Sequence, residues 1–324
     1  MKRIILGIFG IFLIFVGIIG WILPVLPGWL FIFFGLSFIA PAFAARLKRR
    51  VLRKFFKKEI VTLDEWKRLN VHAGFTTRHF SLVLHKADDL LNENTQRCFH
   101  EAISGAGFEP APTRYVFLNQ VHGDNIQVLE GENQLGRGAV FAPNGRGNPA
   151  TTEFYHLMNT DGVLTDLKNT TLLVLTADCL PVFLSAGKGE RQWIGLAHAG
   201  WRGTEKEIAR KALEMIRERS GCGASDIRAI LGPRIGKDHY EVGKEFMDYF
   251  GRAGARERAP LRQKAGKLYF DLVRENKRQL IEAGAKPGNI LDLGICTISE
   301  NEDFYSFRKE KEAAGRIISF ISKF

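Results

Sequence analysis

Three short segments contain side chains that could bind a metal ion or act as nucleophiles. They are Asn-Gln-Val-His-Gly at 119–123, Thr-Ala-Asp-Cys-Leu-Pro at 176–181 and Ala-His-Ala-Gly-Trp-Arg-Gly-Thr at 197–204. Each segment places His122, Cys179 or His198 near glycine or proline, as loops and strand ends do. If the three side chains converge, two imidazoles and one thiolate form a three-ligand zinc site with an open fourth position, which is typical of catalytic zinc. Zinc would there lower the pKa of a bound water to about 7 and so generate hydroxide.

The spacing also permits other interpretations, because the three side chains are far apart along the chain and nothing local forces them together. In a cysteine-dependent hydrolase, Cys179 would be the nucleophile and His122 or His198 its base. A copper-dependent polyphenol oxidase is less favoured than a zinc enzyme, because the chain has only eight histidines and no His-x-His pair. Metal content separates the zinc and nucleophile hypotheses, since a thiolate that binds zinc is no longer a free nucleophile.

The segment after His198 has features of an anion-binding site. Gly-Trp-Arg-Gly at 200–203 precedes Thr-Glu-Lys-Glu at 204–207, which is a predicted capping box that begins a helix. Free amides at the start of this helix and the guanidinium of Arg202 would together favour phosphate. A simple turn with Arg202 in a surface ion pair is the alternative.

The elements that must position these segments are strands and helices in an irregular order. Apolar and β-branched runs predict strands at 113–121, 171–176 and 193–197. Capping residues and glycines predict helices at 88–105, 204–220 and 271–283, and a glycine-rich loop at 131–150. Because no regular βαβ repeat is present, we expect one α+β domain of mixed β-sheets flanked by helices. The four cysteines form no Cys-x-x-Cys pair, which favours free thiols in a reducing compartment.

Six motifs occur between positions 70 and 324 in the order typical of one family. Besides the three segments above, they are Thr-Asp-Gly-Val-Leu-Thr at 160–165, Gly-Pro-Arg-Ile-Gly at 232–236 and Tyr-Ser-Phe-Arg-Lys-Glu at 305–310. With these motifs the chain resembles the laccase-domain family, also called polyphenol oxidase, FAMIN-like or YfiH/YlmD-like purine nucleoside phosphorylase. The chain departs from the family pattern after Thr77-Arg78, where His-Phe-Ser at 79–81 replaces the usual Gly-Gly-Val-Ser.

The resemblance implies an enzyme with zinc held by His122, Cys179 and His198. It implies phosphorolysis of the purine nucleosides adenosine, inosine and guanosine and of methylthioadenosine. It also implies deamination of adenosine. The expected partners are therefore purine nucleosides and phosphate.

Further site residues follow from what these reactions require. Deamination needs a carboxylate that carries a proton, and Asp161 and Asp178 are the candidates, with turn capping as their alternative role. Phosphorolysis needs a cationic group that holds phosphate. Arg202 is the first candidate for that role, and the others for substrate or phosphate binding are Arg308, Arg234 and Arg78.

The segment 1–58 differs in composition from the rest of the chain. It contains ten Lys or Arg and no Asp or Glu, so residues 59–324 carry a net charge of only +1 out of the total of +11. The basicity therefore does not indicate a nucleic-acid surface on the body of the protein. We place the domain boundary between positions 58 and 59.

The stretch 4–45 contains no charged side chain, and its length is enough for two membrane spans of about 20 residues each. Leu-Pro-Val-Leu-Pro-Gly at 23–28 interrupts the run and favours a two-helix hairpin over one span or a signal peptide. With Leu-Pro-Gly-Trp at 26–29, this stretch resembles small bacterial membrane proteins that are named for a Pro-Gly-Pro-Gly-Trp motif. Basic residues flank both ends, including a juxtamembrane linker at 46–58. We therefore expect an inner-membrane anchor with the catalytic domain in the cytoplasm.

Overall fold

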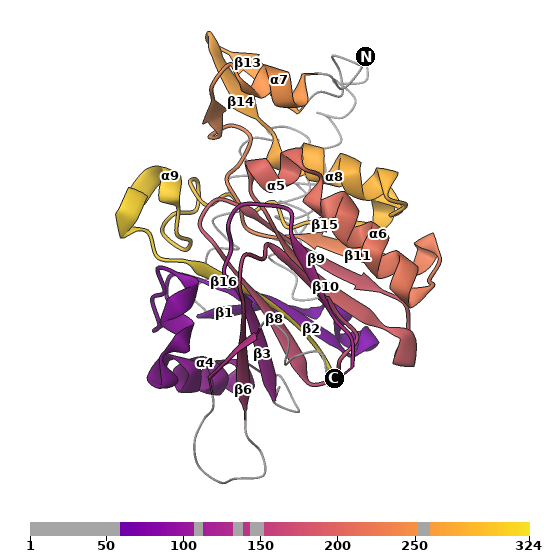
Figure 1. Ribbon diagram of the computed structural model, residues 1–324. Coiled ribbons are helices and arrows are strands. Elements are labelled where there is room, and N and C mark those ends of the chain that lie inside the picture. The colour runs from indigo at the N-terminus through magenta and orange to yellow at the C-terminus, as the bar shows by residue number, and fades with distance from the viewer. Residues whose placement is uncertain (1–58, 107–112, 132–138, 143–151, 252–259) are drawn as a thin grey trace, which may run out of the picture. The chain divides into compact units, whose positions relative to one another are not determined.

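The computed structural model describes residues 59–106, 113–131, 139–142, 152–251 and 260–324 (Figure 1). Contacts divide the chain into Met1–Lys58 and Glu59–Phe324, and every described element belongs to the second unit. The membrane hairpin and the basic linker predicted for 1–58 lie outside the described residues. Within the described ranges, no helix has both the length and the apolar character needed to cross a membrane.

Two mixed sheets form the centre of the unit, as predicted for an α+β domain (Figure 1). The seven-stranded sheet has the order β1-β2-β16-β8-β3-β6-β5, and the six-stranded sheet has the order β15-β11-β9-β10-β7-β4. The strands of the first sheet are β1 (Ile60–Leu63), β2 (Val71–Thr76), β3 (Arg114–Leu118), β5 (Ala139–Ala142), β6 (Glu153–Leu157), β8 (Thr170–Thr176) and β16 (Ile317–Lys323). Those of the second sheet are β4 (Ile126–Leu129), β7 (Gly162–Thr165), β9 (Leu180–Ala186), β10 (Trp193–Ala199), β11 (Ile227–Leu231) and β15 (Ile290–Asp292).

Helices cover the outer faces of the two sheets, which contact each other through β8, β10 and β16. Helix α4 packs on the seven-stranded sheet and α6 on the six-stranded sheet, and α8 packs against α5 and α6 (Figure 1). The α-helices are α4 (Glu93–Gly105), α5 (Trp201–Glu205), α6 (Ile208–Ser220), α7 (Phe246–Phe250), α8 (Leu272–Glu282) and α9 (Phe307–Glu310). Because β8, β9 and β10 are covered on both faces, all their residues are buried, which explains their continuous apolar runs.

Several shorter elements complete the unit. A small sheet has the order β12-β14-β13 and lies beside α7 (Figure 1). Its strands are β12 (Glu241–Val242), β13 (Leu261–Lys264) and β14 (Lys267–Phe270). The 3-10 helices are η1 (Asp64–Leu69), η2 (Ala87–Leu91), η4 (Gly189–Arg191), η5 (Ala224–Asp226), η6 (Pro287–Asn289) and η7 (Lys311–Ala313).

The structure confirms the predicted buried strands and the helix predicted at 271–283, and it corrects three other predictions. The helix predicted at 88–105 is divided into η2 and α4, because the Asn92 side chain accepts hydrogen bonds from the amides of Asn94 and Thr95 and begins a new helix. The loop predicted at 131–150 contains the short strand β5, which pairs with β6.

The capping box predicted at 204–207 is wrong. Thr204 lies inside α5, and its hydroxyl accepts a hydrogen bond from the Asn276 amide at 2.9 Å. Glu207 has a φ of 61° and separates α5 from α6, with no side-chain cap. A tertiary contact thus uses the hydroxyl that the local pattern assigned to capping, and the helix at the anion-binding motif is a single short turn at 201–205.

Three connections cross between the sheets at one edge, and this arrangement creates the candidate site. Strands β3, β6 and β8 are parallel, so their carboxyl ends meet at the same edge of the seven-stranded sheet. From there the chain continues into β4, β7 and β9 of the other sheet. Strand β10 runs antiparallel to β9, so its carboxyl end returns to the same edge. The residues in these connections are therefore brought together although they are far apart in sequence.

A candidate metal centre at the crossover edge

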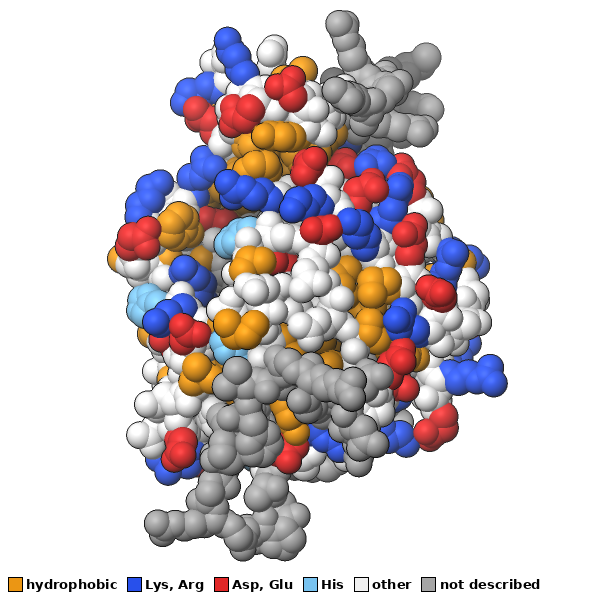
Figure 2. All heavy atoms as spheres, viewed as in Figure 1, with side chains coloured by type: hydrophobic (Ala, Val, Ile, Leu, Met, Phe, Trp, Pro, Cys, Tyr) orange, Lys and Arg blue, Asp and Glu red, His pale blue; other side chains and the backbone are white. Residues whose placement is uncertain are grey.

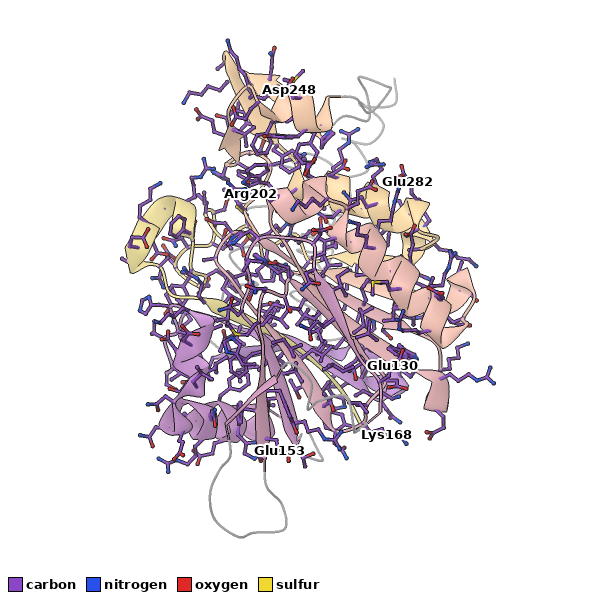
Figure 3. All side chains as sticks on the ribbon, in the orientation of Figure 1. Glu130, Glu153, Lys168, Arg202, Asp248 and Glu282 are labelled. Atoms are coloured by element: carbon purple, nitrogen blue, oxygen red, sulfur yellow. The ribbon has the colours of Figure 1, made fainter. Side chains whose placement is uncertain are left out.

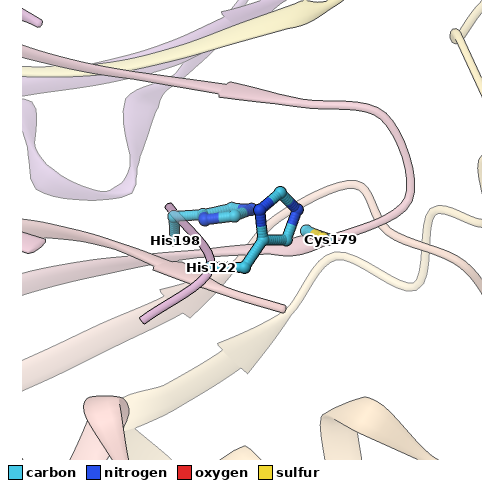
Figure 4. Close-up of side chains that lie close together, drawn as sticks. All are labelled: His122, Cys179 and His198. Carbon is cyan, nitrogen blue, oxygen red and sulfur yellow. The ribbon is translucent and has the colours of Figure 1, made fainter. Parts of the chain in front are cut away.

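His122, Cys179 and His198 meet at this edge (Figure 4). One ligand atom from each side chain lies within 4.8 Å of the others, and the two imidazole rings are 4.8 Å apart at 81°. His122 follows β3, Cys179 lies in the turn between β8 and β9, and His198 is near the end of β10. The set of one sulfur and two nitrogen donors fits a borderline-soft ion such as zinc.

The Asp161 carboxylate holds two of these ligands in place. It is fully buried between β6 and β7. One of its oxygens accepts hydrogen bonds from the His198 Nδ1–H at 2.8 Å and the His122 backbone N–H at 3.0 Å. The other oxygen accepts the backbone N–H groups of Val121 and Gly123 at 3.2 and 2.7 Å. Because a carboxylate only accepts, the proton is on His198 Nδ1, and His198 Nε2 is left free to bind a metal.

The charges at the site favour ionised side chains. Burial alone raises the pKa of the Cys179 thiol, but the charge of His198 and hydrogen bonding from both imidazoles lower it from 9.0 to about 6. Burial likewise opposes protonation of His198, but the Cys179 thiolate and the Asp161 carboxylate raise its pKa from 6.5 to about 9. Burial by itself would raise the pKa of Asp161. The hydrogen bonds from His198 and the backbone amides have the larger combined effect, so the pKa is lowered. The protein thus provides the thiolate that a metal requires.

Two glycines allow the backbone to approach the ligands closely. A Cβ atom at Gly200 would lie 3.0 Å from Cys179 Sγ and 3.3 Å from His122 Cδ2. A Cβ atom at Gly203 would lie 2.7 Å from the Gly123 carbonyl oxygen, which belongs to the His122 loop. The glycines of the Gly-Trp-Arg-Gly segment therefore make room for the candidate ligands and the His122 loop.

A cavity of about 490 Å³ opens next to the three ligands, all of which line it. Arg202 and Arg308 also line it, and Arg202 is labelled in Figure 3. The Arg202 guanidinium lies 4.4 Å from the centre of the Trp201 ring, and that of Arg308 lies 5.3 Å from the centre of the Tyr240 ring. Among the described residues neither arginine has a carboxylate partner, so both charges are available to an anion. In Figure 2 several basic side chains lie above and to the left of a histidine near the centre of this face.

Asp178 lines the same cavity, but its carboxylate is occupied by two hydrogen-bond donors. One oxygen accepts the Thr297 hydroxyl at 2.6 Å, and the other accepts the backbone N–H of Arg308 at 2.6 Å. Asp161, the other predicted proton carrier, is likewise fully hydrogen-bonded.

The structure places Arg234 and Arg78 outside the cavity lining. Arg234 is buried and forms an ion pair with Asp292 at 2.8 Å. Arg78 forms an ion pair with Glu310 at 2.7 Å and packs over the Tyr305 ring. Both arginines connect segments of the protein, whereas Arg202 and Arg308 face the cavity.

Sequence reasoning did not single out three further side chains that line the cavity, Tyr240, Phe307 and Arg316. Phe307 is 40% exposed and lies within the quoted motif at 305–310, so the motif itself contained the signal. Arg316 lies 6.0 Å from the Phe307 ring centre. Tyr240 and Arg316 lie outside every motif, and only the folded structure identifies them.

Comparison with known proteins identifies the family of this chain. The chain is 30% identical over 265 residues to purine nucleoside phosphorylase YlmD of Geobacillus stearothermophilus, covering 78% of this chain and 89% of that protein. It is 30% identical over 233 residues to purine nucleoside phosphorylase YfiH of Escherichia coli, covering 72% and 81%. The crystal structure of Bacillus licheniformis hypothetical protein YfiH aligns with a TM-score of 0.66 at 27% identity, covering 82% of this chain and 97% of that one. Residues 71–323 match the family described as multi-copper polyphenol oxidoreductase laccase, and the chain belongs to that family.

Proposed function

We propose that this chain is a zinc-dependent purine nucleoside phosphorylase that also deaminates adenosine and cleaves methylthioadenosine. One observation carries the proposal: the Cys/His₂ donor set lines the same cavity as Arg202 and Arg308, which have no carboxylate partner among the described residues. Relatives that carry the name purine nucleoside phosphorylase support the reaction class. The donor set supports zinc over copper, since it provides one mixed site rather than a cluster of histidines.

In phosphorolysis, a phosphate oxygen attacks the anomeric carbon of the ribose while the bond from that carbon to the base nitrogen breaks. The guanidinium groups of Arg202 and Arg308 hold the phosphate and stabilise its charge as the bond forms. The exposed Phe307 ring and Tyr240 provide flat apolar surface for the purine. A zinc ion held by His122, Cys179 and His198 supplies a Lewis acid and an activated water when bound.

Metal analysis of the purified full chain, with product analysis on adenosine and phosphate, tests this function. We expect about one zinc per chain, adenine plus ribose 1-phosphate from phosphorolysis, and inosine plus ammonia from deamination. Cys179→Ala and His198→Ala should lose both metal and activity, whereas Cys98→Ala, a change of an exposed thiol, should keep both. If the wild-type protein carries no stoichiometric metal and alkylation of Cys179 abolishes activity, the cysteine-nucleophile hypothesis replaces this one.

We also propose that the segment 4–45 anchors the enzyme in the inner membrane with residues 59–324 in the cytoplasm. The absence of charge throughout this segment and the basic flanks on both sides support this proposal.

A further inference from the structure

The segment 305–310, which contains α9, presents Phe307 and Arg308 to the cavity. The residues that lead into α9, 303–306, are buried, yet Phe307 and Arg308 themselves are exposed. The segment therefore needs fixed attachments to hold these two side chains at the site. The structure shows two such attachments, one on each side.

The first attachment is the Asp178 carboxylate, which accepts the Arg308 backbone N–H and the Thr297 hydroxyl, each at 2.6 Å. Asp178 directly precedes Cys179, so it connects the metal-ligand turn to the segment that carries Arg308. Its φ of 95° is in the left-handed region, which aspartate and asparagine tolerate better than most residues. Both oxygens already accept short hydrogen bonds, an arrangement that suits positioning rather than proton transfer.

The second attachment is Arg78, which reaches the other side of the same segment. Its guanidinium forms an ion pair with Glu310 at 2.7 Å and donates to the Asn301 carbonyl. Glu310 in turn accepts the Ser306 backbone N–H at 2.9 Å, so the ion pair fixes both ends of α9. The guanidinium also lies 4.8 Å from the centre of the Tyr305 ring.

We propose that Asp178 and Arg78 are positioning residues that hold segment 305–310 in place, and so set the affinity of the cavity for nucleoside and phosphate. This assignment rests on the proposed function for the identity of the ligands. The positioning itself rests only on the contacts above.

Hydrogen exchange and steady-state kinetics of the full chain test the proposal. In Asp178→Asn, the new amide cannot accept both donors, and asparagine keeps the backbone conformation. We expect exchange in a peptide covering 305–310 to accelerate about tenfold, as loss of a charge-assisted hydrogen bond implies. KM for nucleoside or phosphate should rise about tenfold with kcat changed less than about threefold, because binding is lost equally in the ground and transition states. Metal content should not change.

Glu310→Gln provides a second variant that removes the Arg78 ion pair without changing shape, and it should shift exchange and KM in the same direction. Asp226→Asn is the matched control, since this carboxylate pairs with Lys188 and lies outside the cavity lining. Unchanged exchange at 305–310 in both variants would overturn the proposal. A loss of kcat of about 100-fold with KM unchanged in Asp178→Asn would instead place Asp178 in the chemical step. If the wild-type protein lacks phosphorolysis, the proposed function fails, and the exchange measurement still decides the positioning role.

Discussion

Replacement of Asp161 by asparagine is the sharpest test of how the proposed metal centre is built. The carboxylate is fully buried and accepts four N–H groups, two on each oxygen. Asparagine offers only one oxygen, so at least two of these donors lose their acceptor. Each buried donor without a partner costs about 1–3 kcal/mol, so we expect the free energy of unfolding to fall by about 4 kcal/mol, in line with the loss of one partner of a buried charged pair.

The same substitution should weaken zinc binding about 10- to 100-fold, because His198 loses the partner that fixes its tautomer and orientation. Urea unfolding of the metal-free protein gives the first quantity, and competition with a chelator gives the second. Asp124→Asn is the control: Asp124 pairs with Lys206 and Lys211 near the surface, so its replacement should cost about 1 kcal/mol or less. If Asp161→Asn behaves like this control in both assays, Asp161 does not organise the site.

Three further predictions concern the thiol, the glycines and the membrane segment. In metal-free protein, the rate of Cys179 alkylation should rise with pH around a midpoint near 6. The reason is that His198 lowers the pKa of the thiol from 9.0 to about 6, so the thiolate persists down to about pH 6. A midpoint near 9.0 would contradict the ion pair with His198. Gly203→Ala should weaken zinc binding, because the new Cβ would lie 2.7 Å from the Gly123 carbonyl oxygen. Gly105→Ala is the control and should leave zinc binding unchanged, because the space around Gly105 is open. Equal zinc affinity in both variants would refute the role of Gly203. Reporter fusions after Lys2 and after Lys58 should both report a cytoplasmic location, and a periplasmic signal after Lys58 would exclude the hairpin.

The sequence alone determined three of the core strands and which residues could perform chemistry, but it did not predict the equally buried β9 and β16. Continuous apolar runs at 171–176 and 193–197 predicted strands, because strands covered on both faces need apolar side chains on both. Capping patterns predicted helix starts correctly where the side chain bonds to its own helix. Asp271, for example, accepts the Arg274 backbone N–H at the start of α8. The pattern failed at Thr204, since a distant Asn276 uses the hydroxyl.

Only the tertiary structure decided that the three candidate ligands meet. Positions as distant in the chain as those of His122, Cys179 and His198 do not require convergence. They converge because β3, β6 and β8 are parallel and release the chain at one edge, while β10 returns to that edge. Tertiary contacts also distinguished the four arginines predicted to bind substrate or phosphate. Arg202 and Arg308 line the cavity, whereas carboxylates distant in sequence pair with the other two. A sequence gives the type of each charged group, but its partner depends on which strands and turns the fold brings beside it.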